Sequence, residues 1–138
     1  MNRADLQAIA QLRVDEAQSL QRAGMYCGAY YLMGYAIECA FKAAIAKQIR
    51  ANDFPDRKLV NDSYTHDLRR LLDLSGLKQE LEKEMNAESK FQLNWSIVKD
   101  WSEEARYRHD ITEPLASDLI EASIGEPHGV YKWLTNWW

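Results

Sequence analysis

The chain has 138 residues, 46% of them hydrophobic and 28% charged, which is the composition of an ordinary globular domain with its own core. Its net charge of −4 argues against the basic surface on which non-specific nucleic-acid binding depends. Cys27 and Cys39 fall about 18 Å apart on one predicted helix, at about 1.5 Å per residue, which is too far for a disulfide bond. We therefore expect free thiols in a reducing compartment, with the cytoplasm as the default location.

The N-terminal part of the chain is predicted to form two helices separated by Gly24. Apolar side chains recur at helical spacing over residues 3–23, and Asn2 is a suitable N-cap. The second helix runs from residue 26 to about residue 49 and is almost continuously apolar. A helix with so little polar surface is normally buried on nearly all sides.

This apolar segment is not expected to cross a membrane, although it approaches the necessary length. Glu38 and Lys42 lie inside it, and charges are costly within a bilayer. A signal peptide is not expected either, because residues 2–5 are polar and charged.

The middle of the chain is less regular. Loop-forming residues fill positions 50–65, which predicts a long irregular connection. The next helix is expected to begin at Tyr64 or Thr65 and to end before Gly76, a plausible C-cap. Residues 78–88 are highly charged and are interpreted as a mostly exposed segment.

Three further helical stretches are predicted. One covers residues 91–106, the next begins at Thr112–Pro114, and a last turn or two follows the break at Gly125–Pro127. No segment alternates between apolar and polar residues as a strand does. The sequence therefore predicts the all-α class, as one domain over residues 1–138 with about five main helices packed as a mostly antiparallel bundle.

A polar stripe on the apolar second helix is the first candidate site. Tyr31, Tyr35, Glu38 and Lys42 fall on one face, and Glu38 and Lys42 are one turn apart. Such groups require partners if they are buried. The stripe is thus either a buried structural network or the wall of a polar groove, and we expect Lys42, Arg106 or His66 to compensate Glu38.

The second candidate site is the polar run from Glu103 to Asp110. Arg106, Arg108 and His109 have the chemistry for phosphodiester cleavage, because a guanidinium holds phosphate and an imidazole moves protons. The alternative is a solvated helix end. No metal site is expected, because the three histidines are far apart in sequence and no metal-binding motif is present.

The C-terminus is rich in tryptophan, with three indoles among its last six residues. Trp133, Trp137 and Trp138 either dock the last helix onto the core or cover a partner. On an acidic chain of this size, we expect a helix-mediated homodimer to bury part of this area.

Four sequence blocks, spread in order over nearly the whole chain, form a pattern. They are Ala29–Ala43, His66-Asp67-Leu68, Trp101–Tyr107 and Gly129–Leu134. Together they resemble the prokaryotic HEPN-domain family. The resemblance implies a helical bundle that usually dimerises, in toxin–antitoxin pairs with a small nucleotidyltransferase, in phage defence or in RNA processing.

Many HEPN proteins are metal-independent endoribonucleases, and their motif is an arginine followed after four to six residues by a histidine. At that spacing ahead of His66, His109 and His128 this sequence has no arginine. The usual nuclease motif is therefore missing, and we expect little or no ribonuclease activity.

The leading hypothesis is a non-catalytic, dimeric HEPN-like module. It is expected to bind a nucleotide, RNA or a protein partner such as a nucleotidyltransferase-type antitoxin, with no cofactor, in a toxin–antitoxin, defence or stress system. Its polar network is Tyr31, Tyr35, Glu38, Lys42, His66 and Arg106. One alternative is an endoribonuclease toxin with a rearranged site at Arg106, Arg108 and His109, and another is a purely structural subunit.

Overall fold

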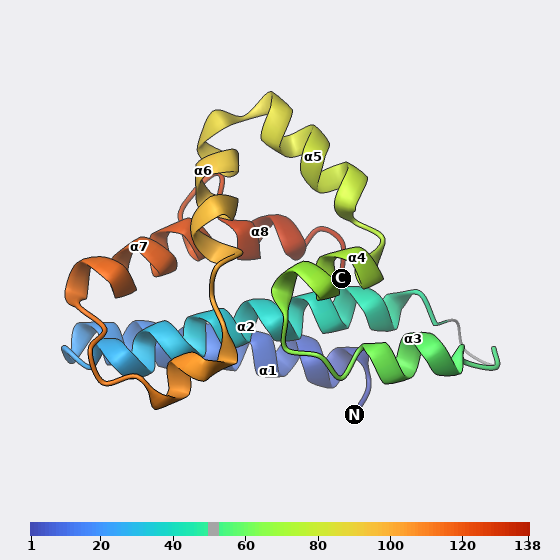
Figure 1. The fold of residues 1–138 in the computed structure, drawn as a ribbon, viewed down its shortest axis with the longest axis horizontal. Helices are drawn as coiled ribbons and strands as arrows, with labels where there is room; N and C mark the ends of the chain where they lie inside the picture. Colours follow the sequence, from blue (N-terminus) through green and yellow to red (C-terminus); the bar gives the residue numbers. More distant parts are fainter. Residues whose placement is uncertain (50–52) are drawn as a thin grey trace.

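The computed structural model describes residues 1–49 and 53–138. It is 73% helical, and the described residues contain no strand, so the all-α class is confirmed. Two long helices, α1 (Arg3–Arg22) and α2 (Tyr26–Lys47), lie side by side (Figure 1). Asn2 caps α1 through a reciprocal pair of hydrogen bonds with Asp5, as its N-cap position predicts.

Several of the remaining elements pack on the α1–α2 pair, whereas α5 and α6 pack on those elements and lie further from the pair (Figure 1). In chain order they are α3 (Arg57–Asp62), α4 (Leu68–Ser75), α5 (Lys78–Ala87), α6 (Ser89–Val98), the 3₁₀ helix η1 (Glu103–Tyr107), α7 (Glu113–Ile124) and α8 (Val130–Leu134). Gly76 ends α4 in the left-handed region at φ 73°, which favours glycine. Within the described ranges, no helix has both the length and the apolar character needed to cross a bilayer.

The core is built around α2, which packs against α1, α4, α7, α8 and η1. Its burial on nearly all sides matches the apolar character of its sequence. The largest fully buried side chains are Phe41, Phe91, Met33, Ile37, Leu68, Leu71, Leu81, Leu119, Leu134, Glu38, Val98 and Val130. Glu38 is the one charged side chain among these large buried groups.

Two boundaries differ from the sequence-based predictions in the middle of the chain. Residues 50–65 are not wholly a loop, because the described part contains α3, whose N-terminus is capped by the Asp56 carboxylate; positions 50–52 lie outside the described residues. The following helix begins at Leu68 and not at Tyr64 or Thr65, since Asp67 accepts from the N–H groups of Arg69 and Arg70.

The predicted helix 91–106 was wrong at its C-terminal end. The α-helix stops at Val98, and the chain continues through Trp101 into η1. Ser102 caps η1 by accepting the Glu104 N–H at 3.2 Å. The break places the Trp101 indole against Gly34 of α2, so long-range packing overrides the helical pattern. The charged segment 78–88 is itself mostly helical, as α5.

Candidate functional site

Glu38 is the centre of a polar cluster on α2, and its side chain is only 1% exposed. Its Oε1 atom accepts from Lys42 Nζ at 2.9 Å and from His66 Nδ1 at 2.8 Å. Lys42 lies one turn further along α2, and His66 comes from the connection between α3 and α4. Because burying a lone carboxylate is costly, these two donors are what make its position tolerable. The other oxygen, Oε2, is buried without a hydrogen-bond partner among the described residues.

Arg106, another predicted partner of Glu38, is not part of this cluster. Within the described chain it makes no ion pair with Glu38, and its guanidinium lies 4.9 Å from the centre of the Tyr107 ring. The phenol raises the pKa of Arg106, and Glu103 and Tyr31 add smaller effects in the same direction. The side chain is exposed, so of the three partners expected for Glu38 (Lys42, Arg106 or His66) the structure provides Lys42 and His66.

His66 links three parts of the chain. Its Nδ1 faces Glu38, and its Nε2 lies 3.2 Å from Glu103 Oε2 on η1. A carboxylate only accepts hydrogen bonds, so both contacts are favourable when both ring nitrogens carry protons. In that state His66 ties α2 to η1, and its role is that of a cross-link between elements. The Glu103 contact was not predicted from the sequence.

An open cleft of about 400 Å³ adjoins His66. Three carboxylates, Asp67, Asp100 and Glu103, line it together with three basic groups, His66, Arg69 and Lys99. Its full lining is Thr65, His66, Asp67, Arg69, Lys99, Asp100, Trp101, Ser102 and Glu103. Arg69 is already paired with Asp100 at 2.8 Å. The cleft therefore offers little net attraction to a phosphate.

The cleft is also lined by Ser102 and His66, the residue types of a serine–histidine catalytic pair, but each makes a contact with another residue. The hydroxyl of Ser102 caps η1, and Nε2 of His66 faces Glu103. Nucleophilic catalysis requires the base to receive the hydroxyl proton, and no hydrogen bond joins Ser102 to His66 among the described residues.

The aromatic part of the α2 stripe forms a continuous row. Tyr31 stacks between Trp101 and Tyr35, with ring centres 6.2 Å apart on both sides. The Arg13 guanidinium of α1 lies 5.9 Å from the centre of the Tyr35 ring. The two tyrosine rings therefore already contact aromatic or cationic neighbours from the same chain. Both tyrosines are partly exposed at the surface.

The three residues of the alternative nuclease site, Arg106, Arg108 and His109, are all exposed. Arg108 donates to both carboxylate oxygens of Asp110, at 2.9 and 3.1 Å, and this pairing lowers the pKa of Asp110. Arg108 lines a depression beside Tyr30, whereas Arg106 is influenced by Tyr31. The 3₁₀ helix η1 ends at Tyr107, so the continuous helix assumed to place Arg106 and His109 on one face does not extend to His109.

The buried cysteine, Cys39, does not supply a reactive thiol. Cys27 and Cys39 are both free. Burial, with a smaller effect from Glu38, raises the pKa of Cys39 to about 11, so its thiol stays protonated near neutral pH. In the described part of the chain no group of three metal-binding side chains converges.

The terminal tryptophans contact the body of the same chain. Trp133 packs against Phe91 at 5.4 Å and Trp137 at 6.0 Å, measured between ring centres. Trp138 meets Tyr131 edge to face at 5.8 Å. They thus dock the last helix, which is the first of the two roles predicted for them.

Comparisons of this chain with protein-family models, with curated proteins and with solved structures give no match.

Proposed function

We propose that this protein is a non-catalytic HEPN-like module that acts by binding another protein, in a toxin–antitoxin, defence or stress system. Its five-helix HEPN-like arrangement, its dimeric state and its cytoplasmic location are part of the same proposal. The partner that the resemblance favours is a nucleotidyltransferase-type antitoxin.

The observation that supports a non-catalytic role is the engagement of the polar groups with one another. Glu38 Oε1 accepts from Lys42 and His66, and the second nitrogen of His66 faces Glu103. A general base must be able to reach a substrate proton. Both ring nitrogens of His66 face carboxylates, one on α2 and one on η1, which supports a structural role for this side chain.

Charge favours a protein partner over RNA or a nucleotide. The cleft beside His66 has no excess of basic groups over its three carboxylates, and binding of a phosphate backbone depends on such an excess. Apolar side chains, in contrast, are available at the surface. Phe54 is 100% exposed, Tyr64 75% and Tyr107 74%, and aromatic residues are enriched in protein interfaces.

Incubation of the purified protein with total RNA, with and without a chelator, tests the absence of catalysis. We expect the RNA to remain intact in both samples over several hours. Cleavage that resists the chelator and disappears in His109→Ala would support the ribonuclease toxin and overturn the proposal.

Isolation of the protein from its native cells after chemical cross-linking tests the mode of action. We expect one other protein in stoichiometric amount, and a nucleotidyltransferase-type protein would identify the toxin–antitoxin setting. Recovery of nucleic acid with no stoichiometric protein would contradict a protein-binding module.

A further inference from the structure

A second pocket, away from His66, is lined by α5, α6, the α7–α8 connection, α8 and the residues that follow α8. Its volume is about 520 Å³, which is within the range of small-ligand sites. The lining residues are Glu84, Phe91, Glu126, Pro127, His128, Lys132, Trp133, Asn136 and Trp137. Aromatic rings and carboxylates thus meet in one place, contributed by parts of the chain that are far apart in sequence.

The basic groups of this pocket are already engaged with carboxylates. Lys132 Nζ lies 3.4 Å from Glu126 Oε1, and both residues belong to the lining. His128 Nε2 lies 3.6 Å from Oε2 of Glu88, which is outside the lining. Within the described chain, Glu84 makes no ion pair. The pocket therefore keeps one negative charge that its own residues do not compensate.

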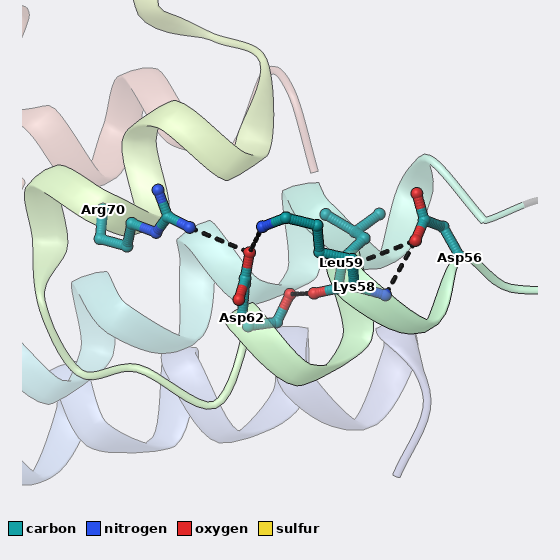
Figure 2. A network of polar contacts seen from close by, with 6 residues as sticks. Asp56, Lys58, Leu59, Asp62 and Arg70 are labelled. Atoms are coloured by element: carbon teal, nitrogen blue, oxygen red, sulfur yellow. Dashed lines mark hydrogen bonds and ion pairs between the residues drawn. The ribbon is translucent and has the colours of Figure 1, made fainter.

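Glu84 differs in this respect from Asp62, the carboxylate at the end of α3. Asp62 pairs with Lys58 at 2.7 Å and with Arg70 of α4 at 2.9 Å (Figure 2). The hydrogen bond from Lys58 is the main cause that lowers the pKa of Asp62, so its charge is stabilised within the chain. Glu84 is partly buried on α5 without such a donor. A cation that donates hydrogen bonds to it would supply the missing contact.

The aromatic part of the pocket offers carbon surface to that cation. Trp133 and Trp137 are partly exposed, and their ring centres lie 6.0 Å apart. Nε1 of Trp137 is buried, so the part of this indole that remains exposed is its carbon surface. Phe91, only 1% exposed, packs against Trp133 at 5.4 Å between ring centres. Indole rings attract cations more strongly than other aromatic side chains do.

We propose that this pocket binds the guanidinium group of an arginine side chain on the partner protein. A guanidinium is planar and carries several N–H groups, so it pairs with a carboxylate through two hydrogen bonds and stacks on aromatic rings. Glu84 and the two indoles match these two properties. A phosphate or carboxylate ligand would instead be repelled by Glu84. This assignment rests on the proposed protein-binding function and gives it a recognition site.

Titration of capped tripeptides into the full ¹⁵N-labelled chain, followed by amide and indole NMR signals, tests the site. One peptide has arginine between two alanines. The second has citrulline, which keeps the shape of the arginine side chain without its charge. Free L-arginine is the third probe, because it separates a small-molecule site from a site for a side chain within a protein.

Three variants are compared with the wild type. Glu84→Gln removes the charge at nearly constant size, and Trp137→Leu removes the indole. Glu82→Gln is the matched control, because Glu82 is an exposed carboxylate on the same helix and does not line the pocket. Melting curves check that all variants remain folded.

The arginine peptide should give saturable shifts of the Trp133 and Trp137 indole signals, and the citrulline peptide should give none. Glu84→Gln should raise the dissociation constant about 10-fold, because a charged hydrogen-bonding partner is lost. Trp137→Leu should raise it about three-fold through loss of the ring. Glu82→Gln should leave it unchanged, and free L-arginine should bind no more tightly than the peptide.

Three results overturn the site. They are the absence of saturable shifts with the arginine peptide, equal binding of the arginine and citrulline peptides, and equal effects of Glu84→Gln and Glu82→Gln. Tighter binding of free L-arginine than of the peptide would overturn the partner side chain as the ligand. Each of these results leaves the proposed function in place. RNA cleavage, measured separately, overturns the proposed function and leaves the affinity of the pocket for guanidinium untouched.

Discussion

Gly34 of α2 is the position at which one added methyl group tests the packing of the candidate site. An ideal Cβ built there lies 2.1 Å from both Nε1 and Cε2 of the Trp101 indole. Trp101 is 3% exposed and stacks on Tyr31, so it has little freedom to turn away. We therefore predict that Gly34→Ala destabilises the protein, although alanine is the better helix former.

The expected loss of stability in Gly34→Ala is the difference between two opposing contributions to the free energy of folding. Alanine in place of glycine inside a helix gains about 1 kcal/mol. A normal carbon contact needs about 3.5 Å, so the indole must move by about 1.4 Å, and overpacking of a rigid core costs about 1–3 kcal/mol or more. Because the neighbour is a buried ring and not a flexible tip, we place the cost at about 3 kcal/mol. The net loss is then about 2 kcal/mol.

Urea unfolding measures this loss, and the same helix offers a control. A net loss of about 2 kcal/mol lowers the urea midpoint by about 1 M for a slope near 2 kcal/mol/M. A Cβ at Gly28 would meet only the Cδ1 tip of the Leu20 side chain, at 3.0 Å. Gly28→Ala should therefore be neutral or stabilising.

A double-mutant cycle identifies the clash partner. In a Trp101→Ala background the methyl group has room, so Gly34→Ala should become neutral or stabilising there. The reasoning is refuted if Gly34→Ala is as harmless as Gly28→Ala in the otherwise unchanged protein. A loss that persists fully in the Trp101→Ala background would also show that another neighbour is responsible.

Three other predictions concern single side chains. Glu38→Ala should lower the melting temperature, because it removes the acceptor of the Lys42 and His66 hydrogen bonds, each worth about 1.5–3 kcal/mol, and an unchanged melting curve would contradict the role of Glu38. With a thiol reagent at pH 8, Cys39 should react slowly in the folded protein, because its pKa is raised to about 11. In denaturant, both Cys39 and Cys27 should react. Fast reaction of Cys39 in the folded state would show that it is not buried. Asp67→Ala should lower the free energy of unfolding by about 1 kcal/mol, because it removes the N-cap of α4. Asp73→Ala in the same helix is the control. Equal effects of the two substitutions would argue against capping.

Local signals were enough to predict several elements. The capping position of Asn2, the apolar run in α2 and the proline in the first turn of α7 each act within a few residues. They predicted the starts of these helices and the all-α class, both of which are confirmed. Asp56 was an equally local signal for the start of α3, but the surrounding loop-forming residues obscured it.

Long-range packing explains what the sequence did not reveal. The pattern of residues 91–106 is helical by itself, but the chain leaves the helix after Val98 so that Trp101 reaches Gly34. That path determines where Glu103 lies, and its contact with His66 could not be inferred from spacing. The pairing of Glu38 with Lys42 was accessible, because residues one turn apart share a helix face.

Titration of single-stranded RNA into ¹⁵N-labelled protein, followed by amide NMR, tests the central claim of a non-catalytic, protein-binding module most directly. The account predicts no saturable shifts for Tyr31, Tyr35, Lys42 or His66, and RNA that is recovered intact. Saturable shifts confined to the α2 stripe and the cleft beside His66, or cleavage of the RNA during the titration, would contradict it.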